Sequence, residues 1–141
     1  MSLREIASLT YWADDVAAAA AWYTEVLGSG PNFTRPGPDG RPSYVAFDID
    51  ERTRLAIAVR TAAPFSAALE PGGAIGNWRV DDLDAVLEKL SSMGAKEWIP
   101  LTPHGPVVSA AVVDPFGNVV GLVSDNHPAA DFRRGAPHRS T

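Results

Sequence analysis

The sequence predicts an α+β fold built from two tandem βαβββ modules. Three observations support this prediction. A helical pattern of apolar residues occurs twice, with an offset of 67 residues and the same acidic start. Segments of alternating apolar and polar residues flank both helical patterns, as expected for strands with one buried face. Turns rich in glycine and proline separate these segments.

The repeat is clearest in the two predicted helices. Asp14-Asp15-Val16 recurs as Asp81-Asp82-Leu83. From each start, apolar residues follow the spacing i, i+3, i+4, i+7, i+10, which places them on one helix face. They are Val16, Ala19, Ala20, Tyr23 and Val26 in the first helix and Leu83, Val86, Leu87, Leu90 and Met93 in the second. An Asp can cap each start, and Gly28 and Gly94 can end the helices. Two unrelated amphipathic helices are the alternative, but the match at five positions and at both ends favours a repeat.

Strands are predicted on both sides of each helix. The segments are residues 6–13, 43–49 and 55–61 in the first module, and residues 73–80, 97–101, 107–113 and 119–124 in the second. In one of them Val45, Phe47 and Ile49 alternate with the residues between them, which is the period of a half-buried strand. Turns are predicted at residues 36–40 and 114–118.

The domain prediction follows from these elements. Residues 1–127 form a single domain whose modules span about 5–61 and 73–125, joined by a linker at 62–72. Residues 128–141 contain three arginines among small residues and prolines, and we expect a flexible C-terminal tail.

Composition excludes several functions. Lys and Arg total 12 against 17 Asp and Glu, so the net charge is −5, which disfavours nucleic-acid and anionic-membrane partners. The absence of cysteine removes thiol catalysis, disulfides and Cys-based metal sites. No segment approaches the roughly 18 apolar residues that span a bilayer, and no apolar signal core follows Met1, so we expect a cytoplasmic protein. Arginine in excess of lysine, with many Ala, Gly and Pro residues, suggests a bacterial source.

Several motifs resemble those of a known superfamily. They are Trp12-Ala13-Asp14-Asp15-Val16, Trp22-Tyr23 and Val26-Leu27-Gly28 in the first module, and Arg79 to Ala85, Met93-Gly94-Ala95 and Asp114-Pro115-Phe116-Gly117-Asn118 in the second. With the tandem βαβββ pattern, they make residues 6–126 resemble the vicinal oxygen chelate superfamily, which includes glyoxalase I, extradiol dioxygenases and bleomycin resistance proteins. The resemblance implies a cupped, incomplete eight-stranded mixed β-barrel with helices outside, and a homodimer.

The resemblance also implies a divalent metal, held by His, Glu or Gln side chains on the first and last strands of each module. The corresponding positions here are Ser8, Ala58, Ile75 and Gly121, and none of these side chains is a competent ligand. A shift of one residue brings no better ligand. The three histidines fall in predicted loops or in the tail: His104, His127 and His138. We therefore predict that the chain has no metal site and no other cofactor.

Without a metal, strand alternation predicts which residues face the cup. This alternation gives the expected ligand contacts Ser8, Thr10, Trp12, Tyr44, Asp48, Ala58, Arg60, Asn77, Arg79 and Gly121. The resemblance adds Trp98, which lies near the region that lids the cup in relatives. Small residues at the centre, with aromatic and polar residues around them, favour a pocket for a small aromatic or carboxylate-bearing molecule. Arg60 and Arg79 could bind its carboxylate or phosphate, with Asp48 balancing one of them. Alternatively, Trp12 closes the barrel end, Arg79 and Asp48 form a structural ion pair, and Tyr44 lies in water at a sheet edge.

Three functions remain open. The first is a binding protein of the bleomycin-resistance type without catalysis. The second is a glyoxalase-type lyase or isomerase, or a dioxygenase-like enzyme, with an atypical or absent metal site and with His104 or Asp48 as the base. His104, between Pro103 and Gly105, is the weak catalytic candidate. The third is a dimeric regulatory or interaction domain that binds no ligand.

Overall fold

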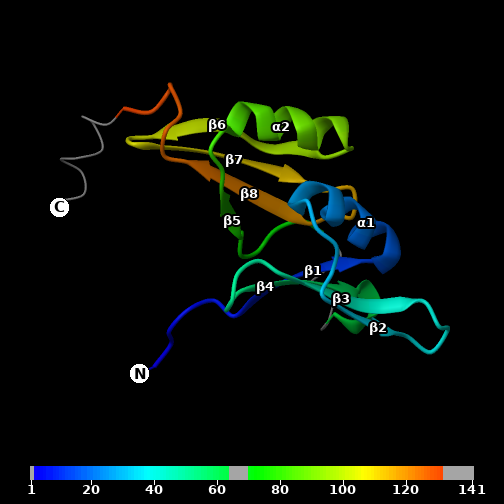
Figure 1. Ribbon diagram of the computed structural model, residues 1–141. Helices are drawn as coiled ribbons and strands as arrows, with labels where there is room; N and C mark the ends of the chain where they lie inside the picture. Colours follow the sequence, from blue (N-terminus) through cyan, green and yellow to red (C-terminus); the bar gives the residue numbers. More distant parts are fainter. Residues whose placement is uncertain (1, 64–69, 132–141) are drawn as a thin grey trace. The chain divides into compact units, whose positions relative to one another are not determined.

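The computed structural model describes residues 2–63 and 70–131, and the chain divides into two compact units, Met1–Glu70 and Pro71–Thr141 (Figure 1). The first unit contains β1 (Ser8–Ala13), α1 (Val16–Leu27), β2 (Phe33–Pro36), β3 (Pro42–Asp48), β4 (Arg54–Val59) and the short 3₁₀ helix η1 (Arg60–Ala62). The second contains β5 (Asn77–Arg79), α2 (Leu83–Ser92), β6 (Lys96–His104), β7 (Val107–Val113) and β8 (Val119–Ser124).

Both units have the same topology. Each has one four-stranded mixed sheet, with the strand order β1-β4-β3-β2 in the first unit and β5-β8-β7-β6 in the second. In each, the first and last strands pair in parallel and the other neighbours pair antiparallel. The predicted α+β fold with two βαβββ repeats is therefore confirmed: residues 2–63 and 70–131 form two mixed sheets and two α-helices without a closed barrel.

Each helix begins and ends as its sequence predicts. Asp15 and Asp82 are the N-caps, and their carboxylates accept hydrogen bonds from Ala18 N and Ala85 N, each at 3.0 Å. These bonds satisfy backbone donors that have no partner within the helix. At the other end of α1, Gly28 adopts the left-handed conformation with φ 82° and terminates the helix.

Apolar side chains hold each helix on its sheet. In the first unit, Tyr11 of β1 packs on Tyr23 of α1 with ring centroids 5.5 Å apart, and Phe47 and Ile57 are fully buried. In the second unit, Leu83, Leu90, Val108 and Leu122 are buried. Burying one such side chain contributes roughly 1.5–3 kcal/mol, so these residues fix the sheet face that each helix covers.

The predicted turn at residues 114–118 is also confirmed. Asp114 Oδ1 accepts hydrogen bonds from Phe116 N at 2.9 Å and Asn118 N at 2.8 Å, and Gly117 adopts φ 94°. Asp114 is buried although it carries a carboxylate, because these backbone donors and the Asn118 amide satisfy it. The turn sets where β8 begins.

Several strand predictions were wrong in extent. β2 was not predicted, β5 covers only Asn77–Arg79 rather than residues 73–80, and β6 extends to His104 rather than ending at 101. β4 ends at Val59 because η1 begins at Arg60. Part of the predicted linker, residues 64–69, and the tail beyond 131 lie outside the described residues.

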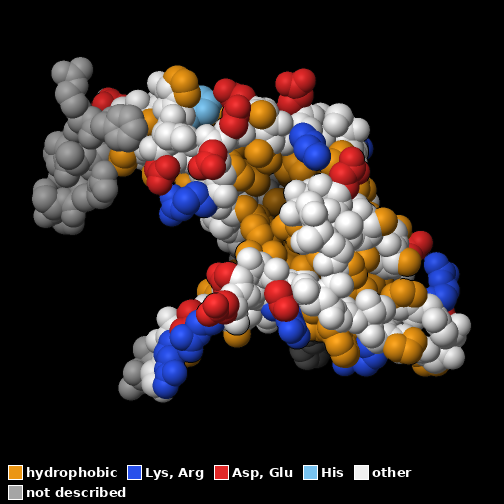
Figure 2. Space-filling model, viewed as in Figure 1, with side chains coloured by type: hydrophobic (Ala, Val, Ile, Leu, Met, Phe, Trp, Pro, Cys, Tyr) orange, Lys and Arg blue, Asp and Glu red, His pale blue; other side chains and the backbone are white. Residues whose placement is uncertain are grey.

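Charged side chains of both signs lie beside one another on the surface in view in Figure 2. The exposed ion pairs of the described residues include Arg52–Glu5, at 3.0 Å. Among the described residues, neither helix has the length and apolar character needed to cross a bilayer.

Candidate functional site

The face of the first sheet opposite α1 carries most of the residues predicted to contact a ligand. Tyr11 points toward α1, so its neighbours Thr10 and Trp12 point the other way. The strand register extends this face into three rows across the sheet: Trp12, Ala58, Tyr44 and Arg35, then Thr10, Ala56, Ala46 and Phe33, then Ser8, Arg54 and Asp48. Ser8, Thr10, Trp12, Tyr44, Asp48 and Ala58 thus share one face, as the alternation predicts.

A pocket of about 360 Å³ opens at the Ser8 end of this face. Its lining residues are Ala7, Ser8, Tyr44, Asp48, Asp50, Glu51, Arg52, Thr53 and Arg54. Three of the predicted contact residues, Ser8, Tyr44 and Asp48, are therefore brought together in one hollow. We call this hollow the Tyr44 pocket.

Two arginines supply the positive charge of the Tyr44 pocket. Arg54 donates from Nε to Asp48 Oδ1 at 3.1 Å, and both side chains are close to half exposed. Arg52 pairs with Glu5 at 3.0 Å. Exposed ion pairs contribute roughly 0–1 kcal/mol, so an anionic ligand can compete for either guanidinium without a large loss of stability. Sequence reasoning missed Arg54 because it stands first in β4, next to the turn.

A tight turn forms the acidic rim of the pocket. The backbone N–H groups of Arg52 and Thr53 donate to Asp50 Oδ1, each at 2.8 Å. These hydrogen bonds hold the pKa of the Asp50 carboxyl below its ordinary value, because they favour the charged form. Asp50 therefore serves as a fixed negative charge and a turn former.

Two side chains of β2 fix the aromatic wall of the pocket. The Arg35 guanidinium carbon lies 4.7 Å from the centre of the Tyr44 ring, a cation–π geometry. Phe33 meets the same ring edge-on, with centroids 6.1 Å apart and an interplanar angle of 67°. Tyr44 lies at the inner side of an edge hairpin and is half-buried, so it is neither free in water nor lost in the core.

The arginines expected to bind an anion have other partners. Arg60 lies in η1 rather than on the sheet, and its Nε donates to Asp14 Oδ1 at 3.2 Å. Arg79 Nη1 donates to Asp125 Oδ2 at 2.8 Å. The expectation that Asp48 balances one of these arginines was wrong. The parallel register explains the Asp14 contact, since Ala13 faces Val59 and the next residue of each strand then lies alongside.

In the second unit, Asn77 lies directly opposite Gly121 in the register of β5 and β8. The Asn77 carboxamide oxygen contacts the space that a side chain at position 121 would occupy. Trp98 is 46% exposed and lies at an irregularity of the β6–β7 pairing, between Glu97 and Ile99.

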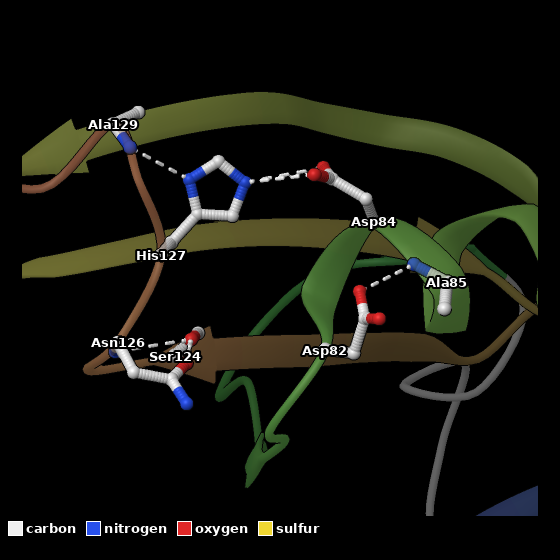
Figure 3. Close-up of polar contacts among 7 residues, drawn as sticks. All are labelled: Asp82, Asp84, Ala85, Ser124, Asn126, His127 and Ala129. Carbon is white, nitrogen blue, oxygen red and sulfur yellow. Dashed lines mark hydrogen bonds and ion pairs between the residues drawn. The ribbon is translucent and has the colours of Figure 1, made fainter.

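The two described histidines differ in their surroundings. His104 was expected in a loop, but it is the last residue of β6, pairs with Val107 and is exposed. His127 lies in the segment after β8 with its ring between Asp84 and Ala129 (Figure 3). Ala129 N donates to Nδ1 at 3.0 Å, so Nε2 carries the proton that faces both Asp84 oxygens at 3.1 Å. Both ring nitrogens of His127 are thus occupied, which leaves no nitrogen for proton abstraction. His138 lies outside the described residues.

The residues at the four expected metal positions do not fit a divalent ion. Ser8 faces Arg54 across the β1–β4 pair, Ala58 has no donor atom, and position 121 has no room for a side chain. Ile75, the fourth position, is also apolar. Among residues 2–63 and 70–131, no three His, Asp or Glu side chains gather in a way that could hold a metal.

Comparison with known proteins agrees with this fold. The family model described as Glyoxalase/Bleomycin resistance protein/Dioxygenase superfamily matches residues 5–122. No curated protein sequence matches the chain.

Solved structures of similar fold include three from bacteria. A glyoxalase-related enzyme from Fulvimarina pelagi has a TM-score of 0.67 at 20% identity, over 86% of this chain and 88% of that one. TnmS3, an antibiotic binding protein from Streptomyces sp. CB03234, has a TM-score of 0.63 at 24% identity, over 89% and 99%. A glyoxalase/bleomycin resistance protein from Catenulispora acidiphila DSM 44928 has a TM-score of 0.56 at 25% identity, over 86% and 98%. The matched residues include both βαβββ units almost in full, and the chain belongs to the glyoxalase/bleomycin resistance protein/dioxygenase superfamily.

Proposed function

We propose that this superfamily member binds a small organic molecule without metal chemistry, and that the Tyr44 pocket holds part of it. The observation that carries the proposal is that Ser8, Tyr44 and Asp48 line one pocket of about 360 Å³ together with Arg54. This volume falls within the range of about 300–1,000 Å³ that is usual for small-molecule sites.

The chemistry of the pocket favours an aromatic molecule that carries a carboxylate. The Tyr44 ring offers a flat apolar surface, and its orientation is fixed by Arg35 and Phe33. The Arg54 guanidinium can form two parallel hydrogen bonds to a carboxylate, a geometry that gives both affinity and orientation. Asp48 holds Arg54 in place until a ligand competes for it.

Two further points support binding rather than catalysis. Neither expected base is placed for the task, since Asp48 accepts a hydrogen bond from Arg54 and His104 stands exposed at a strand end. TnmS3, which shares the fold, is described as an antibiotic binding protein. Catalysis of the lyase type therefore stands as an outcome of the test rather than as a second proposal.

The test is a titration with aromatic carboxylates and aromatic antibiotics. Intrinsic tryptophan fluorescence and the shift in Tm measure binding. We expect saturable binding with at least one class of compound, without product formation. Tryptophan fluorescence should report this binding because Trp12 lies in the same row of the sheet as Tyr44. Tyr44→Leu should weaken binding at least tenfold. Thr34→Ala is the matched control, because Thr34 lies on the same hairpin but points to the opposite face.

Titrations that show no change with any compound would contradict ligand binding. The remaining function would then be a regulatory or interaction domain that binds no ligand. If the protein converts a hemithioacetal to product, and His104→Ala abolishes this activity, the chain is a lyase rather than a binding protein.

We further propose a homodimer in the cytoplasm. The edge strand β6 exposes Trp98 and Ile99, apolar side chains of the kind that subunit contacts cover. Light scattering on the eluting protein tests this, and the mass of one chain at micromolar concentration would contradict it.

A further inference from the structure

Gly121 lies in the middle of β8, between Asn77 of β5 and Ala111 of β7. Its φ lies outside the left-handed region, so the backbone itself does not require glycine. At such a position in a strand, alanine ordinarily stabilises a protein relative to glycine, because the unfolded chain loses conformational freedom. The glycine at position 121 must therefore be explained by a lack of room for a side chain.

Three atoms fill the space where a side chain would begin. A Cβ at position 121 would meet the Asn77 carboxamide oxygen in direct overlap, Ile75 Cγ2 at 2.8 Å and the Gly76 carbonyl oxygen at 2.9 Å. The Gly76 oxygen also accepts a hydrogen bond from Gly121 N at 3.0 Å, so it cannot withdraw without breaking that bond. Asn77 can occupy its place only while residue 121 has no side chain.

The Asn77 carboxamide keeps its hydrogen-bonding groups. Its residue is exposed, and in the part of the chain that the structure describes its side chain has no hydrogen-bond partner. The carboxamide oxygen lies in the space that a Cβ of residue 121 would occupy, while its N–H₂ donors and its oxygen acceptor stay available.

We infer that Gly121 is a positioning residue. By lacking a side chain, it seats the Asn77 carboxamide at the point where a metal ligand on β8 would begin, so a neutral amide stands in place of a ligand to a metal. The amide offers a donor and an acceptor to a carbonyl or hydroxyl group of a small molecule that lies on this face of the second sheet.

The test is a double-mutant cycle of Gly121→Ala and Asn77→Gly, in which thermal unfolding gives the Tm of each variant. We expect Gly121→Ala alone to lower Tm by about 5 °C or more. In the Asn77→Gly background the same substitution should lower Tm by less, because the overlap with the carboxamide is gone and only the contacts with Ile75 and the Gly76 carbonyl oxygen remain. Gly30→Ala is the control, since Gly30 has open space around its Cα and no left-handed φ, and it should not lower Tm.

A second measurement separates positioning from packing alone. The side-chain amide signals of Asn77 in a ¹H–¹⁵N spectrum are identified by their loss in Asn77→Gly. In Gly121→Ala these two signals should move while the backbone signals of the first unit stay in place.

Either of two results would overturn the inference: a rise in Tm for Gly121→Ala, or the same loss of Tm in both backgrounds. Unmoved Asn77 amide signals in a folded Gly121→Ala protein would also overturn it. None of these measurements uses a ligand. Their failure would leave the proposed function untouched, whereas flat ligand titrations would remove the proposed function and leave the positioning role intact.

Discussion

Arg54 and Asp48 stand directly opposite each other on β4 and β3, with Arg54 Nε 3.1 Å from Asp48 Oδ1. Both residues line the Tyr44 pocket, and their ion pair orients the Arg54 guanidinium there. Because both side chains are close to half exposed, the pair contributes little to folding, and changes to it report on ligand binding.

The two members of this pair should affect binding of an aromatic carboxylate in opposite directions. Arg54→Gln removes a charged hydrogen-bond donor, which is worth about 1.5–3 kcal/mol, so affinity should fall about tenfold or more. Asp48→Asn removes the competing carboxylate, so affinity should rise. Calorimetric titration of both variants measures this, with Tm as the check on folding. Equal affinities in both variants would rule out Arg54 as the anion contact.

The N-caps of the two helices should contribute similar amounts to the free energy of unfolding. Asp82→Ala removes the acceptor of the Ala85 N–H group and should lower the free energy of unfolding by about 1 kcal/mol. Asp81→Ala, one residue earlier and outside the cap, is the matched control and should change it by less than about 0.5 kcal/mol. Urea unfolding measures both, and equal losses would show that the cap is not the cause.

The lowered pKa of Asp50 predicts a dependence of stability on pH. The pKa in the folded protein lies below the ordinary value of 3.8, so the charged carboxylate stabilises the folded state above that value. The stabilisation is lost as pH falls through the folded pKa. The difference in free energy of unfolding between the wild type and Asp50→Asn should therefore be constant near neutrality and shrink below about pH 4. A difference that grows toward acid pH would contradict the sign.

His127 should hold the segment after β8 against the first turn of α2. His127→Phe removes both the acceptor of the Ala129 N–H group and the donor to Asp84, so the Ala129 amide should exchange with solvent at least tenfold faster. His104→Phe is the control, because His104 stands exposed at the end of β6. Hydrogen exchange measured by NMR distinguishes them. Unchanged protection of Ala129 in His127→Phe would show that other contacts hold the segment.

The repeat, the helix ends and the buried faces could be predicted from the sequence because each rests on local periodicity. Asp15 and Asp82 stand at capping positions, and Tyr11 alternates with Trp12, so the caps and the sheet faces follow without tertiary information. The edge strand β2 could not be predicted, since all four of its residues are exposed and no apolar alternation marks them.

The ion-pair partners of the site could not be predicted either. Arg60 pairs with Asp14 and Arg79 with Asp125, and these partners depend on the parallel register between strands far apart in the sequence. The same holds for Arg54, which comes opposite Asp48 only once β3 and β4 are aligned. Charge alone indicated an anion site, but the register decided which arginine faces the pocket.

Metal content tests the proposed function most directly, because we propose that the chain binds its ligand without metal chemistry. The measurement is elemental mass spectrometry of protein purified without a histidine tag and without chelators. We expect less than about a tenth of an equivalent of any transition metal per chain. Close to one equivalent would contradict it, and would mean that side chains other than those at positions 8, 58, 75 and 121 assemble a metal site.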